Sequence, residues 1–332
     1  MANIKEANKE ILKELEATGE RLEKVRAEIG KVIFGQNEVI ELALTAILAG
    51  GHALLVGAPG LAKTKLATNL GRVLGLDEKR VQFTPDLMPA DILGSEVLDE
   101  TENGRRQFRF VPGPVFCQLL MADEINRASP RTQSALLQAM QEHHVTVAGV
   151  RHDLPKPFHV LATQNPIEQE GTYPLPEAQL DRFMFQIDVP YPSLEAERRM
   201  LFATTGEEDE MAAKVLKTAE LMNAQRLTRL IPVGEQVTDA ILRVVRAARP
   251  GEEASPEINH GVAWGPSPRA SQALMLGIRA RALLQGRLSP SIDDVAELIG
   301  PVFKHRMALN FTARAEGETI EAIIARQKNL LA

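Results

Sequence analysis

Between Val32 and Pro190, short apolar runs alternate with longer segments in which apolar residues recur three or four positions apart. The short runs predict buried strands, and the periodic segments predict helices. The predicted strands are Ala53–Val56, Val81–Thr84, Leu119–Ala122, Phe158–Thr163 and Phe183–Val189. Because strands that alternate with helices form parallel sheets, we expect an α/β core over residues 31–190.

Two other segments predict β-hairpins inserted into this core. Asn103-Gly104 is a tight-turn pair, and alternating polar and aromatic residues follow it at Gln107–Phe110. The second candidate combines Val145–Val147, the turn residues Ala148-Gly149, and Val150. Either hairpin could be an ornament on the solvent side, or it could reach a partner or a central pore.

Beyond Pro190 the strand patterns give way to helical periods. The clearest helical segments are Val237–Arg249, Pro268–Leu284, Pro290–Ile299 and Glu318–Lys328. This pattern predicts a small all-helical second domain over residues 191–332.

Residues 1–30 form a third region, in which apolar side chains are three, four or seven positions apart. These side chains are Ile4, Ala7, Ile11, Leu15, Leu22, Val25 and Ile29. They predict an amphipathic helix, or a helix pair, that is interrupted near Gly19 and ends at Gly30. We favour packing on the protein's own core over a partner-binding arm.

Composition narrows the class of protein. The chain has 332 residues, enough for two domains, and its net charge of −6 argues against nucleic acid as the main partner. The single cysteine, Cys117, excludes an internal disulfide, fits a reducing compartment and precedes an apolar segment, so we expect a buried structural thiol. We find neither a signal-peptide pattern nor a membrane-spanning run, and we therefore expect a cytoplasmic protein.

The strongest functional motif is Gly57-Ala-Pro-Gly-Leu-Ala-Lys-Thr64, directly after an apolar strand. A glycine-rich turn that leads into a helix through Lys-Thr surrounds phosphate with backbone N–H groups. Lys63 then binds the terminal phosphates and the Thr64 hydroxyl binds Mg²⁺. Ala62 stands where this loop usually has its second glycine. Alanine costs little there if the residue has helical dihedral angles, since only a positive φ would demand glycine.

Polar residues end two of the predicted strands. Asp123 and Glu124 follow one apolar run, and Asn165 follows another. Next to a phosphate-binding loop, Asp123 would hold Mg²⁺ through water, and Glu124 would orient and deprotonate the attacking water. Asn165 could bridge the γ-phosphate and this water, although Asn-Pro alone is more typical of a turn.

Two arginines are weaker candidates. Arg182 follows a short predicted helix, where it could act as an arginine finger on a neighbouring subunit or simply cap the helix dipole. Arg269 lies in the first turn of a helix that begins with Ser267 as N-cap and Pro268 at the first position. A cation is disfavoured at that end, which suggests an anionic partner, although an exposed arginine is an equal alternative.

Taken in order, these motifs closely resemble those of the MoxR-type AAA+ ATPases. The resemblance is carried by Gly57–Thr64, Ala122–Ala128, Ala162–Pro166, Glu168–Phe183 and Ser267–Ser271, between Gly35 and Arg306. It implies an AAA+ core with a five-stranded parallel sheet and hairpin inserts, a small helical lid, and assembly into a ring that is hexameric in the family. Ala62 matches the family's own form of the loop.

The resemblance also implies roles for individual residues. The catalytic set is Lys63, Glu124, Asn165 as sensor 1, Arg182 as the finger acting on the neighbour, and Arg269 as sensor 2. The ATP-binding set is Gly57, Ala58, Pro59, Gly60, Leu61, Ala62, Lys63, Thr64 and Lys65 around the phosphates, with Val32, Ile33, Gly35 and Gln36 around the adenine. Mg²⁺ is held by Thr64 and Asp123, partly through water. The lid would carry Arg269 toward or away from the phosphate.

The function implied is ATP hydrolysis that drives chaperone-like remodelling, activation or metal-cofactor insertion of a separate partner protein, often one with a von Willebrand factor A domain. One alternative is a nucleic-acid motor, supported only by Arg105, Arg106 and Arg109 in the first hairpin. The other is a nucleotide-gated scaffold with little turnover, against which Glu124 and Arg182 argue.

Overall fold

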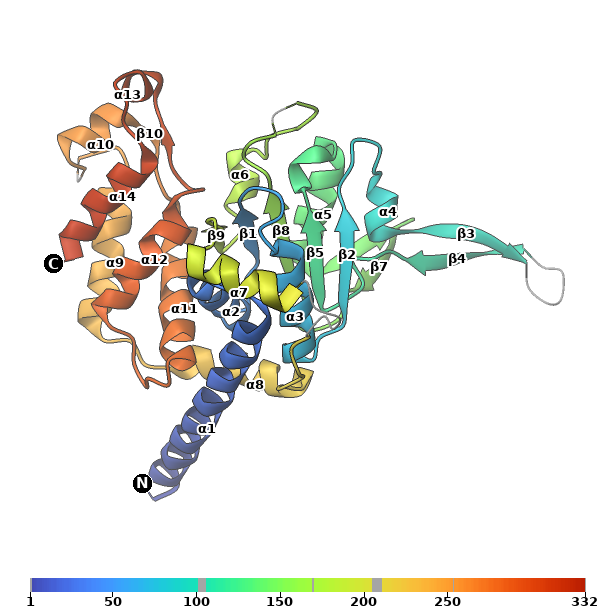
Figure 1. The fold of residues 1–332 in the computed structure, drawn as a ribbon, viewed down its shortest axis with the longest axis horizontal. Helices are drawn as coiled ribbons and strands as arrows, with labels where there is room; N and C mark the ends of the chain where they lie inside the picture. The colour runs from blue at the N-terminus through green and yellow to red at the C-terminus, as the bar shows by residue number, and fades with distance from the viewer. Residues whose placement is uncertain (1, 101–105, 169, 205–210, 253, 332) are drawn as a thin grey trace.

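A five-stranded parallel sheet forms the centre of the molecule, with strand order β2-β5-β8-β1-β9 (Figure 1). The computed structural model describes residues 2–100, 106–168, 170–204, 211–252 and 254–331, with the backbone alone for residues 2–9 and 204. The strands of the sheet are β1 (Ala53–Val56), β2 (Glu78–Gln82), β5 (Leu119–Asp123), β8 (His159–Gln164) and β9 (Phe185–Asp188). All five predicted strands are confirmed, with ends that differ by at most three residues.

Helices cover both faces of this sheet. The helices in the first 190 residues are α1 (Ala2–Val32), α2 (Asn37–Leu48), α3 (Lys63–Leu74), α4 (Pro89–Leu93), α5 (Pro130–Glu142) and α6 (Glu177–Leu180). Alternate residues of β1 point to opposite faces, so Ala53 and Leu55 join one buried cluster and Leu54 the other. The first cluster includes α1, α2, α3 and the C-terminal helices, whereas the second includes α4 and α5.

Both predicted hairpins are confirmed. The first consists of β3 (Gly94–Glu100) and β4 (Arg106–Pro112), and the second of β6 (His144–Val147) and β7 (Val150–Asp153). The turn pair Asn103-Gly104 lies outside the described residues. In Figure 1 the first hairpin projects far from the body of the molecule. The two hairpins touch, because the ring of Phe110 stacks on that of His152 with centroids 3.8 Å apart.

The C-terminal region is helical, as predicted. Its helices are α7 (Leu194–Thr204), α8 (Thr218–Leu230), α9 (Glu235–Ala247), α10 (Pro256–Gly261), α11 (Pro268–Leu284), α12 (Ile292–Phe303), α13 (Phe311–Ala315) and α14 (Ile320–Lys328). One feature was not predicted: β10 (Val262–Trp264) and β11 (Ala308–Leu309) form a short antiparallel pair. Strands of two and three residues are too short to leave a recognisable alternation in the sequence.

The N-terminal helix differs from the prediction because α1 is continuous through both Gly19 and Gly30. A Cβ atom on Gly19 would lie 3.1 Å from the Cα of Gly286, just after α11, so this glycine permits a close helix contact rather than a break. Leu22, Val25 and Ile29 are fully buried. This confirms that α1 packs on the protein's own core. Among the described residues, no helix combines the length and apolar character needed to cross a membrane.

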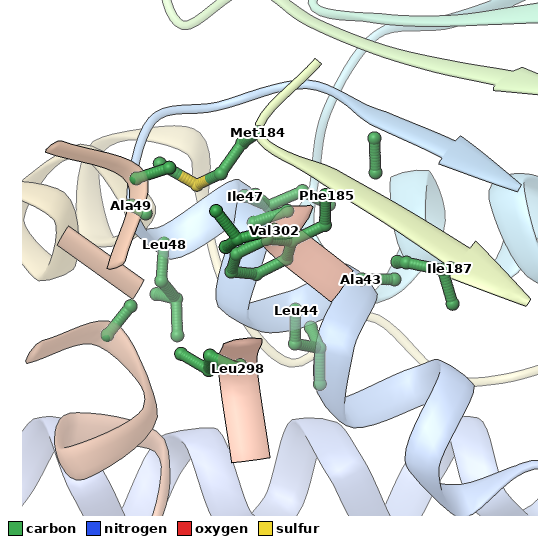
Figure 2. Packing of buried hydrophobic residues seen from close by; sticks show 14 of the residues in the cluster. Ala43, Leu44, Ile47, Leu48, Ala49, Met184, Phe185, Ile187, Leu298 and Val302 are labelled. Carbon is green, nitrogen blue, oxygen red and sulfur yellow. The ribbon is translucent and has the colours of Figure 1, made fainter. Parts of the chain in front are cut away.

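Figure 2 shows how the C-terminal helices are joined to the sheet. Side chains of α2, β9 and α12 interdigitate, with Ile47, Phe185 and Val302 at the centre of the contact. Gly277 of α11 adds a close approach, because a Cβ there would lie 2.9 Å from the Phe185 ring. The lid and the sheet therefore share one continuous apolar core.

Two buried histidines lie at the amino end of the sheet. His52 Nδ1 accepts a hydrogen bond from the backbone N–H of Val160, so its Nε2 carries the proton and donates to the Met140 carbonyl. His159 Nε2 accepts from Gln225 of α8. Burial lowers the pKa of His52 to about 3 and that of His159 to about 4. Both rings are therefore neutral, with every ring nitrogen in a hydrogen bond.

Because His52 and His159 are buried and neutral, we predict that the folded protein loses stability at a pH well above the one at which carboxylates protonate. Both folded-state pKa values lie below the unfolded value near 6.5, so the unfolded chain binds more protons and stability falls as pH decreases from about 6.5 toward 4. By pH 5 each histidine should reduce the free energy of unfolding by about 2 kcal/mol. Urea unfolding from pH 7.5 to 5 measures this.

His52→Gln should remove about one third of the pH dependence, because burial also lowers the pKa of a third histidine, His305. His260→Gln, a change at an exposed histidine, should leave the pH dependence unaltered. Equal pH dependence in the protein and in His52→Gln would contradict this assignment.

Candidate active site

Five of the seven residues predicted to act in catalysis or metal binding line one cavity at the carboxyl edge of the sheet. Lys63 and Thr64 come from the loop after β1, Asp123 and Glu124 from the end of β5, and Asn165 from the end of β8. The cavity has a volume of about 430 Å³, and its full lining is Pro59, Gly60, Leu61, Ala62, Lys63, Thr64, Lys65, Arg80, Gln82, Asp123, Glu124, Thr163 and Asn165. Strands β1, β8 and β5 are consecutive neighbours, which is why their polar ends meet.

Ala62 does not have the helical dihedral angles that would make alanine inexpensive. Its φ is 54° and its ψ is 20°, in the left-handed region, and it is the N-cap of α3. For an L-residue with a Cβ this conformation costs about 1–2 kcal/mol. The loop therefore has at Ala62 the left-handed backbone conformation that glycine adopts without cost, and alanine is strained there.

Lys63 is held by the loop itself. Its ammonium group donates to the carbonyl oxygens of Gly57 at 2.5 Å and Ala58 at 2.8 Å. Partial burial lowers the pKa of Lys63, and the nearby Asp123 and Glu124 carboxylates oppose that shift. The loop thus positions a cation at the wall of the cavity.

Asp123 and Thr64 present oxygen atoms suited to Mg²⁺. The Thr64 hydroxyl lies 3.4 Å from Asp123 Oδ2, and the Thr163 hydroxyl donates to Asp123 Oδ1 at 2.5 Å. One carboxylate and one hydroxyl are the limited protein ligands that Mg²⁺ uses when it keeps several waters and binds phosphates. The described residues contain no cluster of three or more His, Cys, Asp or Glu side chains that could hold a metal ion.

Arg80 also contacts the Asp123 carboxylate, and sequence analysis did not predict this. It donates to Oδ2 through Nε at 3.2 Å and through Nη2 at 2.7 Å. The sequence of β2 is typical of an amphipathic edge strand, and its pattern does not indicate that Arg80 belongs to the site. Pairing with β5 is what brings it there.

Glu124 is held from both sides. Gln82 donates to its Oε2 at 2.8 Å, and the Arg127 guanidinium lies 3.0 Å from the same oxygen. Arg127 also pairs with Glu168, whose other oxygen accepts from Asn165 Nδ2 at 3.3 Å. This ion pair and hydrogen bond lower the pKa of Glu168. Glu124 and Asn165 are therefore linked through two side chains that sequence analysis did not assign to the site.

A second cavity, of about 270 Å³, adjoins the loop and is more apolar. It is lined by Val32, Ile33, Phe34, Gln36, Pro59, Gly60, Leu61, Ala62, Lys65, Tyr191, Pro192, Glu197 and Met200. Gln36 is 5% exposed; its Nε2 donates to the Leu61 carbonyl, and its Oε1 has no hydrogen-bond partner. A buried acceptor without a partner fits the exocyclic amine of adenine. Gly35, with φ of 71°, shapes the turn but does not line the cavity.

The two predicted arginines lie elsewhere. Arg182 and Arg269 line a third cavity of about 250 Å³ together with Gly51 and His52, which precede β1, and Met184, which precedes β9. Its walls therefore belong to the amino edge of the sheet, opposite the phosphate-binding loop. Within the described part of the chain, this cavity shares no lining residue with the Lys63 cavity. The structure does not bring Arg269 to the loop of its own chain.

One buried ion pair joins the two segments that carry these arginines. Arg306, after α12, is 2% exposed and donates through Nε to Asp181 Oδ1 at 2.6 Å. Its other nitrogens donate to backbone carbonyls, including that of Phe183 at 2.6 Å. Asp181 Oδ2 accepts from the Ser267 hydroxyl at 3.0 Å, and Ser267 is the predicted N-cap of α11. Asp181 thus joins the segment that carries Arg182 to the helix that carries Arg269.

The single cysteine behaves as predicted. Cys117 is fully buried, and burial raises the pKa of its thiol to about 12.

We predict that Ala62→Gly stabilises the protein by about 1 kcal/mol, because glycine relieves the left-handed strain at a small cost in chain entropy. A urea midpoint measures the change. Ala325→Gly, at an exposed position inside α14, is the matched control and should destabilise by about 0.5–1 kcal/mol. Destabilisation by both changes would contradict the strained geometry at Ala62.

We predict that Asp181→Asn destabilises the protein by about 3 kcal/mol, because it leaves Arg306 as a buried charge without its counter-ion. Asp188→Asn removes the partner of Lys304 in an exposed pair and should cost less than about 1 kcal/mol. Urea unfolding compares the two. Equal effects would show that Asp181 is not the anchor of this joint.

Comparison with known proteins agrees with this geometry. A family model described as "ATPase family associated with various cellular activities (AAA)" matches residues 52–185, and one described as "AAA lid domain" matches residues 257–327. The chain is 42% identical to Chaperone MoxR1 of Mycobacterium tuberculosis, over 92% of this chain and 80% of that protein. It is 32% identical to the protein MoxR of Paracoccus denitrificans, over 87% and 89% of the two chains.

The fold matches that of an inferred ATPase from Cytophaga hutchinsonii whose crystal structure is known. The TM-score is 0.89, with 35% identity and 98% of each chain covered. The motifs, the fold and these relatives agree, and the chain belongs to the MoxR family of AAA+ ATPases.

Proposed function

We propose that this chain binds and hydrolyses ATP with Mg²⁺ in a ring oligomer, hexameric as in the family, and that hydrolysis drives chaperone-like remodelling, activation or metal-cofactor insertion of a partner protein. The observation that carries the proposal is the position of the arginines. Arg182 and Arg269 lie at the sheet edge opposite the phosphate-binding loop, so a complete site needs a second copy of the chain.

At the carboxyl edge, each side chain has a defined task. Lys63 and the loop N–H groups bind the phosphates, and Gln36 accepts a hydrogen bond from the adenine amine. Mg²⁺, held by Thr64 and Asp123, would neutralise charge on the β- and γ-phosphates. Glu124 orients the attacking water and takes its proton, and Asn165 fixes the water against the γ-phosphate.

At the amino edge, the arginines complete the neighbour's site. Arg182 approaches the γ-phosphate bound by the next subunit, and Arg269, held beside it through Asp181, approaches the same phosphates. By analogy with GTPases, a missing arginine finger lowers the rate by ~10³–10⁵. A change in nucleotide state then acts across the subunit boundary rather than between the core and lid of one chain.

On this proposal the partner is a protein, and the first hairpin contacts it directly. Leu98 and Phe108 are directly opposed on β3 and β4, and they are 55% and 70% exposed. An exposed apolar pair on a projecting hairpin supports contact with a protein surface. A relative's name, Chaperone MoxR1, supports a client-assisting role, and we extend this to a client that includes a von Willebrand factor A domain.

The hairpin gives less support to the nucleic-acid motor. Arg109 pairs with Asp99 at 2.7 Å, and Arg106 lies opposite Glu100 in the strand register. Within the described part of this hairpin, acidic residues match the basic ones across the strands. Arg105 lies outside the described residues.

We predict that Glu124→Gln and Arg182→Ala each reduce ATP turnover to background, and that mixing the two proteins restores activity. In a mixed ring, Arg182 of a Glu124→Gln subunit can serve the intact Glu124 of its neighbour. The ATPase rate of the reassembled mixture measures this, with light scattering to verify ring formation.

Mixing Glu124→Gln with itself, or Arg182→Ala with itself, provides the background. Arg314→Ala, at an exposed lid arginine, should retain full activity alone. If mixed rings form and remain inactive, or if Arg182→Ala alone keeps its rate, the shared site is wrong. Assembly with ATP binding but no turnover would instead favour the nucleotide-gated scaffold.

A further inference from the structure

Asp123 already accepts hydrogen bonds on both carboxylate oxygens from this chain's own side chains. Oδ1 accepts from the Thr163 hydroxyl, and Oδ2 accepts from Arg80 Nε and Nη2 at 3.2 and 2.7 Å. Oδ2 is also the oxygen that faces the Thr64 hydroxyl. Asp123 is only 9% exposed, and Arg80 contributes charge compensation that a buried carboxylate cannot obtain from water.

Arg80 reaches this position along the sheet. It pairs in register with Met121, two residues before Asp123 on the neighbouring strand, and its side chain extends toward the carboxyl edge. Nη2 also donates to Gln82 Oε1 at 3.1 Å, and Gln82 in turn holds Glu124. The Arg80 side chain remains 50% exposed, so it can turn away into solvent without uncovering apolar core.

We propose that Arg80 is a tethered counter-ion that competes with Mg²⁺ for Asp123, so that binding of the metal–nucleotide complex requires the guanidinium to release Oδ2. The inference rests on the proposed function, because it concerns the same metal position.

The competition follows from charge and geometry. Thr64 and Asp123 Oδ2 are the two protein oxygens that Mg²⁺ would use, and a guanidinium nitrogen 2.7 Å from Oδ2 occupies the space of the ion or its water shell. Two cations on one carboxylate oxygen also repel each other. Because a hydrogen bond to a charged group is among the stronger ones, loss of the Arg80 contact should raise the Mg²⁺ affinity about tenfold or more.

Arg127 cannot take over this task. Arg127 pairs with Glu124, at 3.0 Å, and with Glu168, and within the described part of the chain it makes no hydrogen bond or ion pair with Asp123. The two acidic residues at the end of β5 thus pair with different arginines. Arg127 pairs with Glu124, whereas Arg80 pairs with Asp123, the proposed metal ligand.

The first experiment needs no nucleotide. Protein freed of nucleotide is titrated with MgCl₂ while the unfolding temperature is measured, for the natural chain and for Arg80→Gln. The natural chain should hardly respond at 1 mM Mg²⁺, whereas Arg80→Gln should rise by several degrees, because Asp123 then prefers a metal ion. Arg80→Gln combined with Asp123→Asn should lose the response.

The second experiment measures binding of a fluorescent ATP analogue at increasing Mg²⁺. Arg80→Gln should reach half-maximal binding at about one tenth of the Mg²⁺ concentration that the natural chain needs. Arg80→Lys, which keeps the charge but makes a single contact, should lie between them. Arg109→Gln, a change in an exposed ion pair on the hairpin, should match the natural chain.

The outcomes separate the two proposals. An unchanged or higher Mg²⁺ requirement in Arg80→Gln, or an equal response to Mg²⁺ alone in both proteins, overturns the counter-ion. Loss of analogue binding at saturating Mg²⁺ would make Arg80 a phosphate ligand and also overturns it. If the natural chain binds no analogue at any Mg²⁺ concentration, the proposed function fails, while the titration without nucleotide still decides the role of Arg80.

Discussion

The parallel direction of five strands is the constraint from which the arrangement of functional groups follows. Parallel strands place all their carboxyl ends at one edge, so the loop after β1, the acids after β5 and Asn165 after β8 converge on one cavity. The same constraint sends the segments that precede β1 and β9 to the other edge. Arg182 belongs to one of these segments, and so its distance from Lys63 is a property of the sheet itself.

The lid is attached at this amino edge of the sheet, next to Arg182. Asp181 binds both Arg306 and Ser267, so one carboxylate holds the end of α12, the start of α11 and the segment before β9. Burial lowers the pKa of Arg306, and the hydrogen bond and charge of Asp181 oppose that shift. The apolar contact of Phe185 with α2 and α12 continues the joint into the core (Figure 2). A joint of this kind suits the proposed action of Arg182 and Arg269 on another subunit.

At the carboxyl edge, charge is balanced within the chain. Lys63 is bound by loop carbonyls, Asp123 by Arg80, and Glu124 by Gln82 and Arg127. These contacts keep each reactive side chain in a defined position. On our proposal, the contact between Arg80 and Asp123 is exchanged for one with the metal before the chemistry can occur.

Sequence patterns predicted the elements that depend on local periodicity or on a contiguous motif. The five strands, both hairpins, α11 with Ser267 as its cap, and the convergence of Lys63, Asp123 and Asn165 all follow from such patterns. What they missed depends on contacts between distant segments. Arg80 joins the site only through strand pairing, and α1 continues through Gly19 because another helix lies against that glycine.

Ala62 shows a different limit. Its residue type favours the right-handed helical region, but the loop geometry requires a left-handed backbone at that position. Alanine in place of the motif's glycine therefore does not tell which backbone conformation the loop has at position 62, and the structure is needed to determine it. The edge on which Arg269 lies was likewise beyond the sequence, because it depends on how the lid packs against the sheet.

The most direct test of the account is the ATPase rate per subunit measured against protein concentration, with mass followed by light scattering. If the site is divided between the two edges of the sheet, the rate per subunit should rise steeply as the protein assembles, and it should stay at background in Arg182→Ala at every concentration. A constant rate from a monomer, insensitive to Arg182→Ala, would show that one chain holds a complete site and would contradict the account.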